Sequence, residues 1–101
     1  NVECDLRLGL IAFKAKLVDM STDGRAFLLG DPAIPVCGGT ELKRVQIRSN
    51  GGDPIEVDIH VDQVLQAVLP NGARATRIGC RILTDKERLE KLIRLFVIEL
   101  R

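Results

Sequence analysis

The chain has 101 residues, a hydrophobic fraction of 46%, a charged fraction of 29% and a formal net charge of +1. This length and composition are typical of a single globular domain over residues 1–101 and exclude a disordered chain. A net charge this small argues against electrostatic binding of DNA or of an acidic membrane surface. No apolar run approaches the roughly 18 residues of a membrane helix. We therefore expect neither DNA nor a membrane as a partner.

Most of the chain alternates apolar and polar residues with the period of two that indicates strands. Strands are expected at residues 2–8, 13–18, 25–29, 41–48, 55–64 and 75–83. Glycine, proline and asparagine clusters separate them, among them residues 50–54 and 70–72. In the fifth strand the alternation that begins at Ile55 slips after Val61, so that Val64 and Leu65 are both apolar. Such a slip predicts a bulge or a sharp bend, which would curve the sheet toward a barrel.

The period changes after Leu83. Residues 84–87 read Thr-Asp-Lys-Glu, a T-x-x-E capping box that predicts the start of a helix. The expected core face of this helix consists of Leu89, Leu92, Ile93, Phe96 and Leu100. Leu95, Val97 and Ile98 widen the apolar stripe, so the helix end is expected to plug a barrel or to meet a partner, a second copy included. The predicted fold is mainly β: a six-stranded antiparallel barrel with one C-terminal α-helix.

Catalytic and metal chemistry are weakly indicated. Ser21 and His60 could belong to a triad, but no G-x-S-x-G elbow accompanies them. Asp58 and Asp62 flank His60 on one strand face and could bind a metal weakly, but a solvated polar strand face is the favoured explanation. Cys4, Cys37 and Cys80 are widely spaced and are expected to be buried thiols in a reducing cytoplasm. We expect no enzyme, no metal site and no cofactor.

Two pairs of arginines are spaced four residues apart, Arg44 with Arg48 and Arg77 with Arg81. On a strand, each pair shares one face and lies about 13 Å apart. Either pair could bind anionic groups, because a guanidinium forks onto phosphate or onto the acceptor edge of guanine. A solvated barrel exterior is the alternative. Gly79, between the second pair, would let a ligand approach the backbone closely.

The connection between the second and third strands reads Asp19-Met20-Ser21-Thr22-Asp23-Gly24. On an extended segment, Asp19 and Ser21 point the same way, and a carboxylate accepts two parallel hydrogen bonds, as the donor edge of a guanine would supply. Gly24 allows the positive φ that a turn requires. An ordinary Asx or Ser turn is the alternative interpretation.

These six residues resemble the D/N-x-S-x-x-G motif of PilZ domains, which bind the bacterial second messenger cyclic di-GMP. The segments at 39–42, at 55–64 and at 77–82, followed by a helix, are similar in order to YcgR-like flagellar-brake proteins. The resemblance implies that Asp19, Ser21 and Gly24 bind and shape the ligand site, with Gly79 and Arg81 lining the same surface. The family's R-x-x-x-R motif would either precede Asn1 or be absent from this protein, because both arginine pairs follow the D-x-S-x-x-G segment.

The resemblance also implies a receptor rather than an enzyme, with cyclic di-GMP as its ligand. It implies a further N-terminal domain, control of motility by a ligand-induced domain rearrangement, and a cytoplasmic location, at the flagellar basal body if motor proteins are partners. A second hypothesis is a PilZ-like barrel that binds no nucleotide and docks a protein, or forms a homodimer, through the apolar helix end at 95–100.

Overall fold

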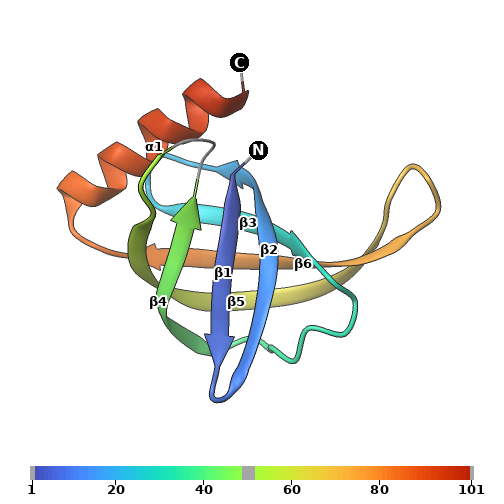
Figure 1. The fold of residues 1–101 in the computed structure, drawn as a ribbon. Helices are drawn as coiled ribbons and strands as arrows, with labels where there is room; N and C mark the ends of the chain where they lie inside the picture. Colours follow the sequence, from blue (N-terminus) through green and yellow to red (C-terminus); the bar gives the residue numbers. More distant parts are fainter. Residues whose placement is uncertain (1, 49–51, 101) are drawn as a thin grey trace.

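The structure, a computed structural model, describes residues 2–48 and 52–100, and the side chains of the C-terminal helix up to Phe96. Its elements are β1 (Glu3–Leu8), β2 (Ile11–Met20), β3 (Arg25–Gly30), β4 (Glu41–Arg48), β5 (Ile55–Val68), β6 (Arg74–Leu83) and α1 (Lys86–Leu100). All neighbouring strands pair antiparallel, in the order β1-β2-β3-β6-β5-β4, and the sheet closes on itself (Figure 1). The predicted six-stranded barrel with one C-terminal helix is confirmed.

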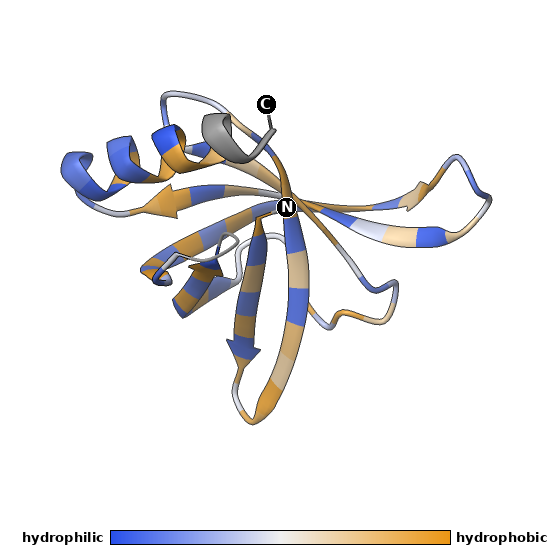
Figure 2. Ribbon diagram, turned by 45° about the horizontal axis from the view of Figure 1, so that its top comes forward, coloured by the Kyte–Doolittle hydropathy of each residue, from blue (hydrophilic) through white to orange (hydrophobic). Residues whose placement is uncertain are grey.

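Strand alternation builds the barrel core. On β5, Ile55, Val57, Ile59 and Val61 are buried while the residues between them are exposed or half-buried. On β6, Ile78, Cys80 and Ile82 are buried, and Arg77 and Arg81 are exposed. Figure 2 shows this alternation as stripes along the strands. Burying each Leu, Ile or Val side chain stabilises the fold by roughly 1.5–3 kcal/mol. The interior is therefore filled with aliphatic side chains.

Three strands contain irregular registers, and each has a local cause. The predicted slip in β5 is a bulge between Val61 and Gln63. A second bulge in β2, between Leu17 and Asp19, leaves Val18 as the extra residue, with 41% of its surface exposed. β4 shifts register between Leu42 and Val45, where Arg44 takes the left-handed φ of 56°. Bulges of this kind bend the strands, which helps the sheet to close.

The helix α1 runs along one end of the barrel (Figure 1). Leu92 and Phe96 are buried in the barrel core, and Leu89 and Ile93 are half-buried, as the predicted core face requires. Leu95 is half-buried and also packs against that core. The side chains of Val97, Ile98 and Leu100, which the docking hypothesis also used, lie outside the described residues. Within the part of the chain that the structure describes, no helix is both long and apolar enough to cross a membrane.

Two local predictions are wrong. The helix cap is Asp85 rather than Thr84, because Asp85 Oδ1 accepts the amide hydrogen of Arg88 at 2.7 Å, three residues along. Aspartate caps as well as threonine, and the helix begins one residue later than the T-x-x-E pattern implied. Cys4 and Cys80 are buried as expected, but Cys37 is exposed, because it lies in the loop between β3 and β4.

Candidate functional site

Two predicted site residues of the β2–β3 connection, Asp19 and Ser21, lie on one outward face of the barrel. Asp19 is opposite Phe27 and Met20 is opposite Ala26. Asp19 and Ser21 are exposed, with the half-buried Met20 between them. The bulge at Val18 precedes this segment and sets the direction in which Asp19 points. The spacing of two therefore brings the carboxylate and the hydroxyl to the same side, as the sequence predicted.

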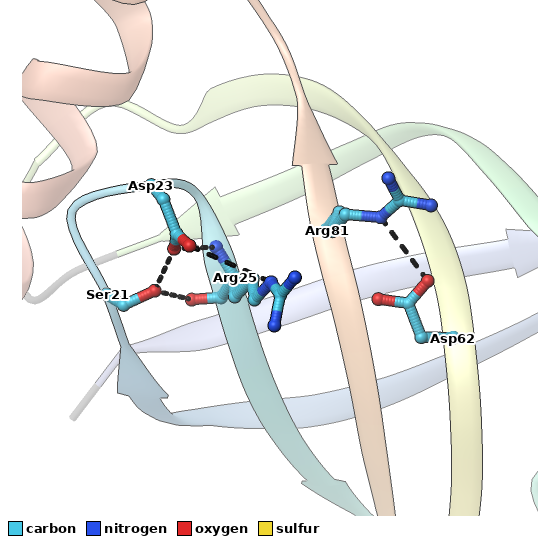
Figure 3. A network of polar contacts seen from close by, with 5 residues as sticks. All are labelled: Ser21, Asp23, Arg25, Asp62 and Arg81. Carbon is cyan, nitrogen blue, oxygen red and sulfur yellow. Dashed lines mark hydrogen bonds and ion pairs between the residues drawn. The ribbon is translucent and has the colours of Figure 1, made fainter.

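Ser21 and Asp23 organise the turn through their side chains. The Ser21 hydroxyl donates to the Asp23 carboxylate and lies 3.3 Å from the carbonyl oxygen of Arg25 (Figure 3). The Arg25 amide donates to Asp23 Oδ1 at 3.2 Å. The hydrogen bond from Ser21, assisted by the one from the Arg25 amide, holds the pKa of Asp23 below its usual value. The carboxylate of Asp23 is therefore ionised at neutral pH and keeps Ser21 in place.

Gly24 has the positive φ that the sequence predicted, 91°. Its amide donates to the carbonyl of Ser21 at 3.1 Å, and its carbonyl accepts the amide hydrogen of Ile82 at 2.9 Å. A Cβ at this position would lie 3.6 Å from the side chain of Leu89 in α1. The turn is thus tied to β6 and lies against the helix.

Gly79 lies on β6 opposite Phe27, on the same face as Asp19. The sequence suggested that a ligand could approach the backbone of Gly79 closely, but Gly79 is buried. A Cβ there would stand 3.2 Å from the Phe27 ring and 3.3 Å from Cγ of Gln63. The guanidinium of Arg77 lies 4.3 Å from the centre of that ring. The missing side chain therefore makes room for Phe27, which Arg77 covers by a cation–π contact.

Arg81 lies two residues beyond Gly79, and a carboxylate from the β5 bulge orients it. Its Nε donates to Asp62 Oδ1 at 3.3 Å (Figure 3). The same Asp62 oxygen lies 3.7 Å from His60 Nε2, and His60 Nδ1 lies 4.0 Å from Glu41 Oε1. Asp58, which the sequence placed beside His60, instead accepts the amide hydrogen of Arg44 at 3.0 Å. His60 therefore belongs to a polar row of β4, β5 and β6.

The arginines of β4 have different surroundings. Arg48 is half-buried and bonded to Asp5, with Nε 2.9 Å from Oδ2 and Nη2 3.1 Å from Oδ1. Its guanidinium joins β4 to β1 and is engaged by protein carboxylates. A hollow of about 940 Å³ lies nearby, between β1, β2, β4 and β5, with Arg44 and Arg48 in its lining. None of Asp19, Ser21, Gly24, Gly79 and Arg81 lines it; Asp19, Ser21 and Arg81 are exposed, whereas the two glycines are buried.

The arrangement does not support acid–base catalysis by Ser21 and His60. Ser21 bonds to Arg25 on β3, Arg25 pairs with Arg81 on β6, and Arg81 pairs with His60 on β5. Three strand spacings of about 4.8 Å separate the two side chains, roughly 14 Å. Among the residues at 2–48 and 52–96, no group of histidine, cysteine and acidic side chains is placed to hold a metal ion.

Four contributors to this face were missed from the sequence: Asp23, Arg25, Phe27 and Asp62. The sequence held a local signal for Asp23, because an aspartate whose side chain accepts the backbone amide hydrogen two residues later forms an Asx turn. The others had none, because their contacts cross from β3 to β6 and from β6 to β5, strands that are distant in sequence.

Comparisons with known proteins define the fold. No protein-family model matches the sequence, and no curated protein matches it. Among solved structures, the PilZ domain of YcgR from Escherichia coli with c-di-GMP superposes with a TM-score of 0.78 at 17% identity, over 97% of this chain and 81% of that one. The chain therefore has the fold of a PilZ domain.

MrkH of K. pneumonia has the same fold over part of its length. Its complex with c-di-GMP gives a TM-score of 0.79 at 20% identity over 98% of this chain. Its apo form gives 0.77 at 23% identity over 96% of this chain. The chain spans 48% and 47% of those two MrkH chains. It therefore corresponds to just under half of MrkH.

Proposed function

We propose that this chain is a cyclic di-GMP receptor domain and not an enzyme. One observation carries the proposal: Asp19, Ser21 and Arg81 share an outward face of a PilZ-fold barrel, and solved structures of that fold include complexes with c-di-GMP. An acceptor carboxylate, a hydroxyl and a guanidinium side by side suit a guanine edge next to a phosphate. The open surface also suits a ligand that a further segment covers.

Each predicted residue has a role in this proposal. The Asp19 carboxylate accepts from the ring N–H and the exocyclic amine of a guanine. The Ser21 hydroxyl, now bonded to Asp23, exchanges that partner for the ligand. Gly24 keeps the turn in its left-handed conformation, and Gly79 leaves room for the Phe27 ring beside β6. Arg81 supplies donors for acceptor atoms of the ligand.

The downstream effect that we propose is a domain rearrangement. An arginine loop and a further domain before Asn1 would close over the bound ligand, and a ligand drives such closure only if it binds the closed state better. A Cβ at Gly24 would lie 3.6 Å from Leu89, so the turn is close to α1, and binding could also act on the helix. Control of motility through flagellar motor proteins, in the cytoplasm at the basal body, is the physiological role proposed.

Calorimetric titration of cyclic di-GMP into the protein with its native upstream sequence tests the proposal. We expect micromolar or tighter binding that the Asp19→Ala, Ser21→Ala double variant loses. Arg74→Gln, on the protruding β5–β6 hairpin, is the control and should bind as the wild type does. Binding that survives in the double variant would place the ligand elsewhere, and no binding by a folded wild-type protein would refute the proposal.

A protein-interaction module is the second candidate. Leu10 is fully exposed and Ile11 is 53% exposed at the tip of the β1–β2 hairpin, which projects from the barrel (Figure 1). Exposed aliphatic side chains at a hairpin tip favour contact with another protein surface. A folded wild-type protein that gives no heat with cyclic di-GMP would favour this candidate. In that case the double variant Leu10→Ser, Ile11→Ser should lose binding to the partner protein that the wild type binds.

A further inference from the structure

We propose that Arg25 and Arg81 together form a clamp for one phosphate group of the ligand, with Arg25 a binding residue that the D-x-S-x-x-G pattern does not include. The inference rests on the proposed function, since it assigns part of the same face. Both arginines are exposed, with 73% and 53% of their side-chain surfaces accessible. They come from β3 and β6, which are adjacent in the barrel.

The backbone places the two arginines directly opposite each other. Arg25 and Arg81 are Cα partners in the β3–β6 register. The neighbouring pair, Gly24 and Ile82, is hydrogen-bonded through the Ile82 amide and the Gly24 carbonyl. Because hydrogen-bonded and non-hydrogen-bonded pairs alternate, the arginines occupy a non-hydrogen-bonded position. At such positions the Cα atoms are about 4.5 Å apart and the side chains are closest, so two like charges there are unfavourable.

Carboxylates hold the two guanidiniums from their Nε sides. Arg25 Nε lies 3.7 Å from Asp23 Oδ2, and Arg81 Nε lies 3.3 Å from Asp62 Oδ1. Figure 3 shows Asp23 in the turn beside β3 and Asp62 on the far side of β6, with the Arg25 guanidinium between β3 and β6 and the Arg81 guanidinium turned toward β5. Among the described residues, no ion pair engages the terminal nitrogens of either guanidinium. Four N–H bearing nitrogens therefore remain for one incoming acceptor.

The ligand group that fits this arrangement is an anion. A guanidinium has donors and no acceptor, and it binds phosphate oxygens through two parallel hydrogen bonds. A negative charge between the opposed arginines also relieves their mutual repulsion, which a neutral guanine edge would not do. Ser21 joins the same row, because its amide donates to the Arg25 carbonyl at 2.8 Å.

The distance to Asp19 matches a nucleotide. Asp19 is two residues before Ser21, so its row lies about 7 Å along the strands from the row of Arg25 and Arg81. A guanine edge on Asp19 and a phosphodiester on the arginines would be separated by a comparable length within one nucleotide. The face thus places the acceptor Asp19 where the donor edge of a guanine would lie, and the donors Arg25 and Arg81 where the phosphodiester would lie.

The test is calorimetric titration of cyclic di-GMP into the wild-type protein and the variants Arg25→Gln, Arg25→Lys and Arg74→Gln. We expect Arg25→Gln to weaken binding about 10- to 100-fold, the usual effect of losing a charged hydrogen bond. Arg25→Lys keeps the charge without the fork and should lose less, and Arg74→Gln should lose nothing. Raising the salt concentration about tenfold should weaken the wild type more than Arg25→Gln, because salt screens exposed charges.

Stability without ligand gives a second readout. Arg25→Gln removes one of two opposed like charges, so it should melt at or above the temperature of the wild type. Wild-type affinity in Arg25→Gln, or equal losses in Arg25→Gln and Arg74→Gln, would overturn the clamp while the receptor function stands. A folded wild-type protein that does not bind cyclic di-GMP would refute the receptor function, and the clamp with it.

Discussion

Replacing Gly24 by alanine tests how far the turn depends on its left-handed backbone. Gly24 has a φ of 91°, and an L side chain in the left-handed region costs about 1–2 kcal/mol. The added Cβ would lie 3.6 Å from the Ile82 carbonyl oxygen and from Leu89, which is ordinary contact, so no steric cost is added. We expect the free energy of unfolding to fall by about 1–2 kcal/mol, which lowers the Tm of a domain of this size by about 4–16 °C.

Calorimetric melting of Gly24→Ala beside Gly72→Ala provides the assay. Gly72 has a φ of 84° in the β5–β6 turn, and a Cβ added there would meet no atom within 4 Å, so it carries the same backbone cost alone. The two variants should lose similar stability, and only Gly24→Ala should alter ligand binding. An unchanged Tm in Gly24→Ala would show that the turn is not held left-handed. If Gly24→Ala lost several times as much stability as Gly72→Ala, the added Cβ would cause packing strain that the distances around Gly24 do not predict.

Three further predictions concern the helix and the buried thiols. Leu92→Ala should reduce the free energy of unfolding in urea by about 2–5 kcal/mol, because Leu92 is 1% exposed between α1 and the barrel; a loss below about 1 kcal/mol would contradict that packing. Asp85→Ala should cost about 0.5–2 kcal/mol in the same assay and Thr84→Ala clearly less, whereas the reverse order would restore the T-x-x-E cap. Burial raises the pKa of Cys4 and of Cys80 to about 12, above the ordinary 9.0, so folding favours the protonated thiols. That contribution is complete below about pH 9 and is lost as the pH rises toward about 12, so urea melts should show an alkaline decline that Cys4→Ala with Cys80→Ala reduces. Equal alkaline declines in the wild type and in the Cys4→Ala, Cys80→Ala variant would contradict a contribution from the buried thiols.

The strands and the helix could be predicted because their signals are local. Alternation from Ile55 to Val61 gives the buried face of β5 directly, and the lost phase after Val61 marks its bulge. The bulge at Val18 was missed, although Leu17 and Val18 are consecutive apolar residues, a break in alternation of the kind that marks the β5 bulge. The cap was misplaced for a different reason: Thr84 and Asp85 both satisfy the capping rule, and only the helix geometry decides between them.

The candidate site divides in the same way. Asp19, Ser21 and Gly24 belong to one connection, so the shared face of Asp19 and Ser21 and the positive φ at Gly24 follow from local spacing. The filling of the space over Gly79 by Phe27 depends on the β3–β6 register, which joins strands about fifty residues apart. No pattern within either strand contains that register. The partners of Arg81 and the opposition of Arg25 to it were therefore visible only in the folded chain.

The measurement that most directly tests cyclic di-GMP binding at this face is a titration followed by amide chemical shifts in ¹H–¹⁵N NMR spectra. The largest changes should fall on residues 19–25 and 79–82, which form the face of Asp19, Ser21 and Arg81. Residues at the β1–β2 hairpin tip, Leu10 and Ile11, should not move. Chemical-shift changes centred on that tip or on the hollow lined by Arg48 would contradict the proposed site, as would the absence of changes at ligand concentrations well above micromolar.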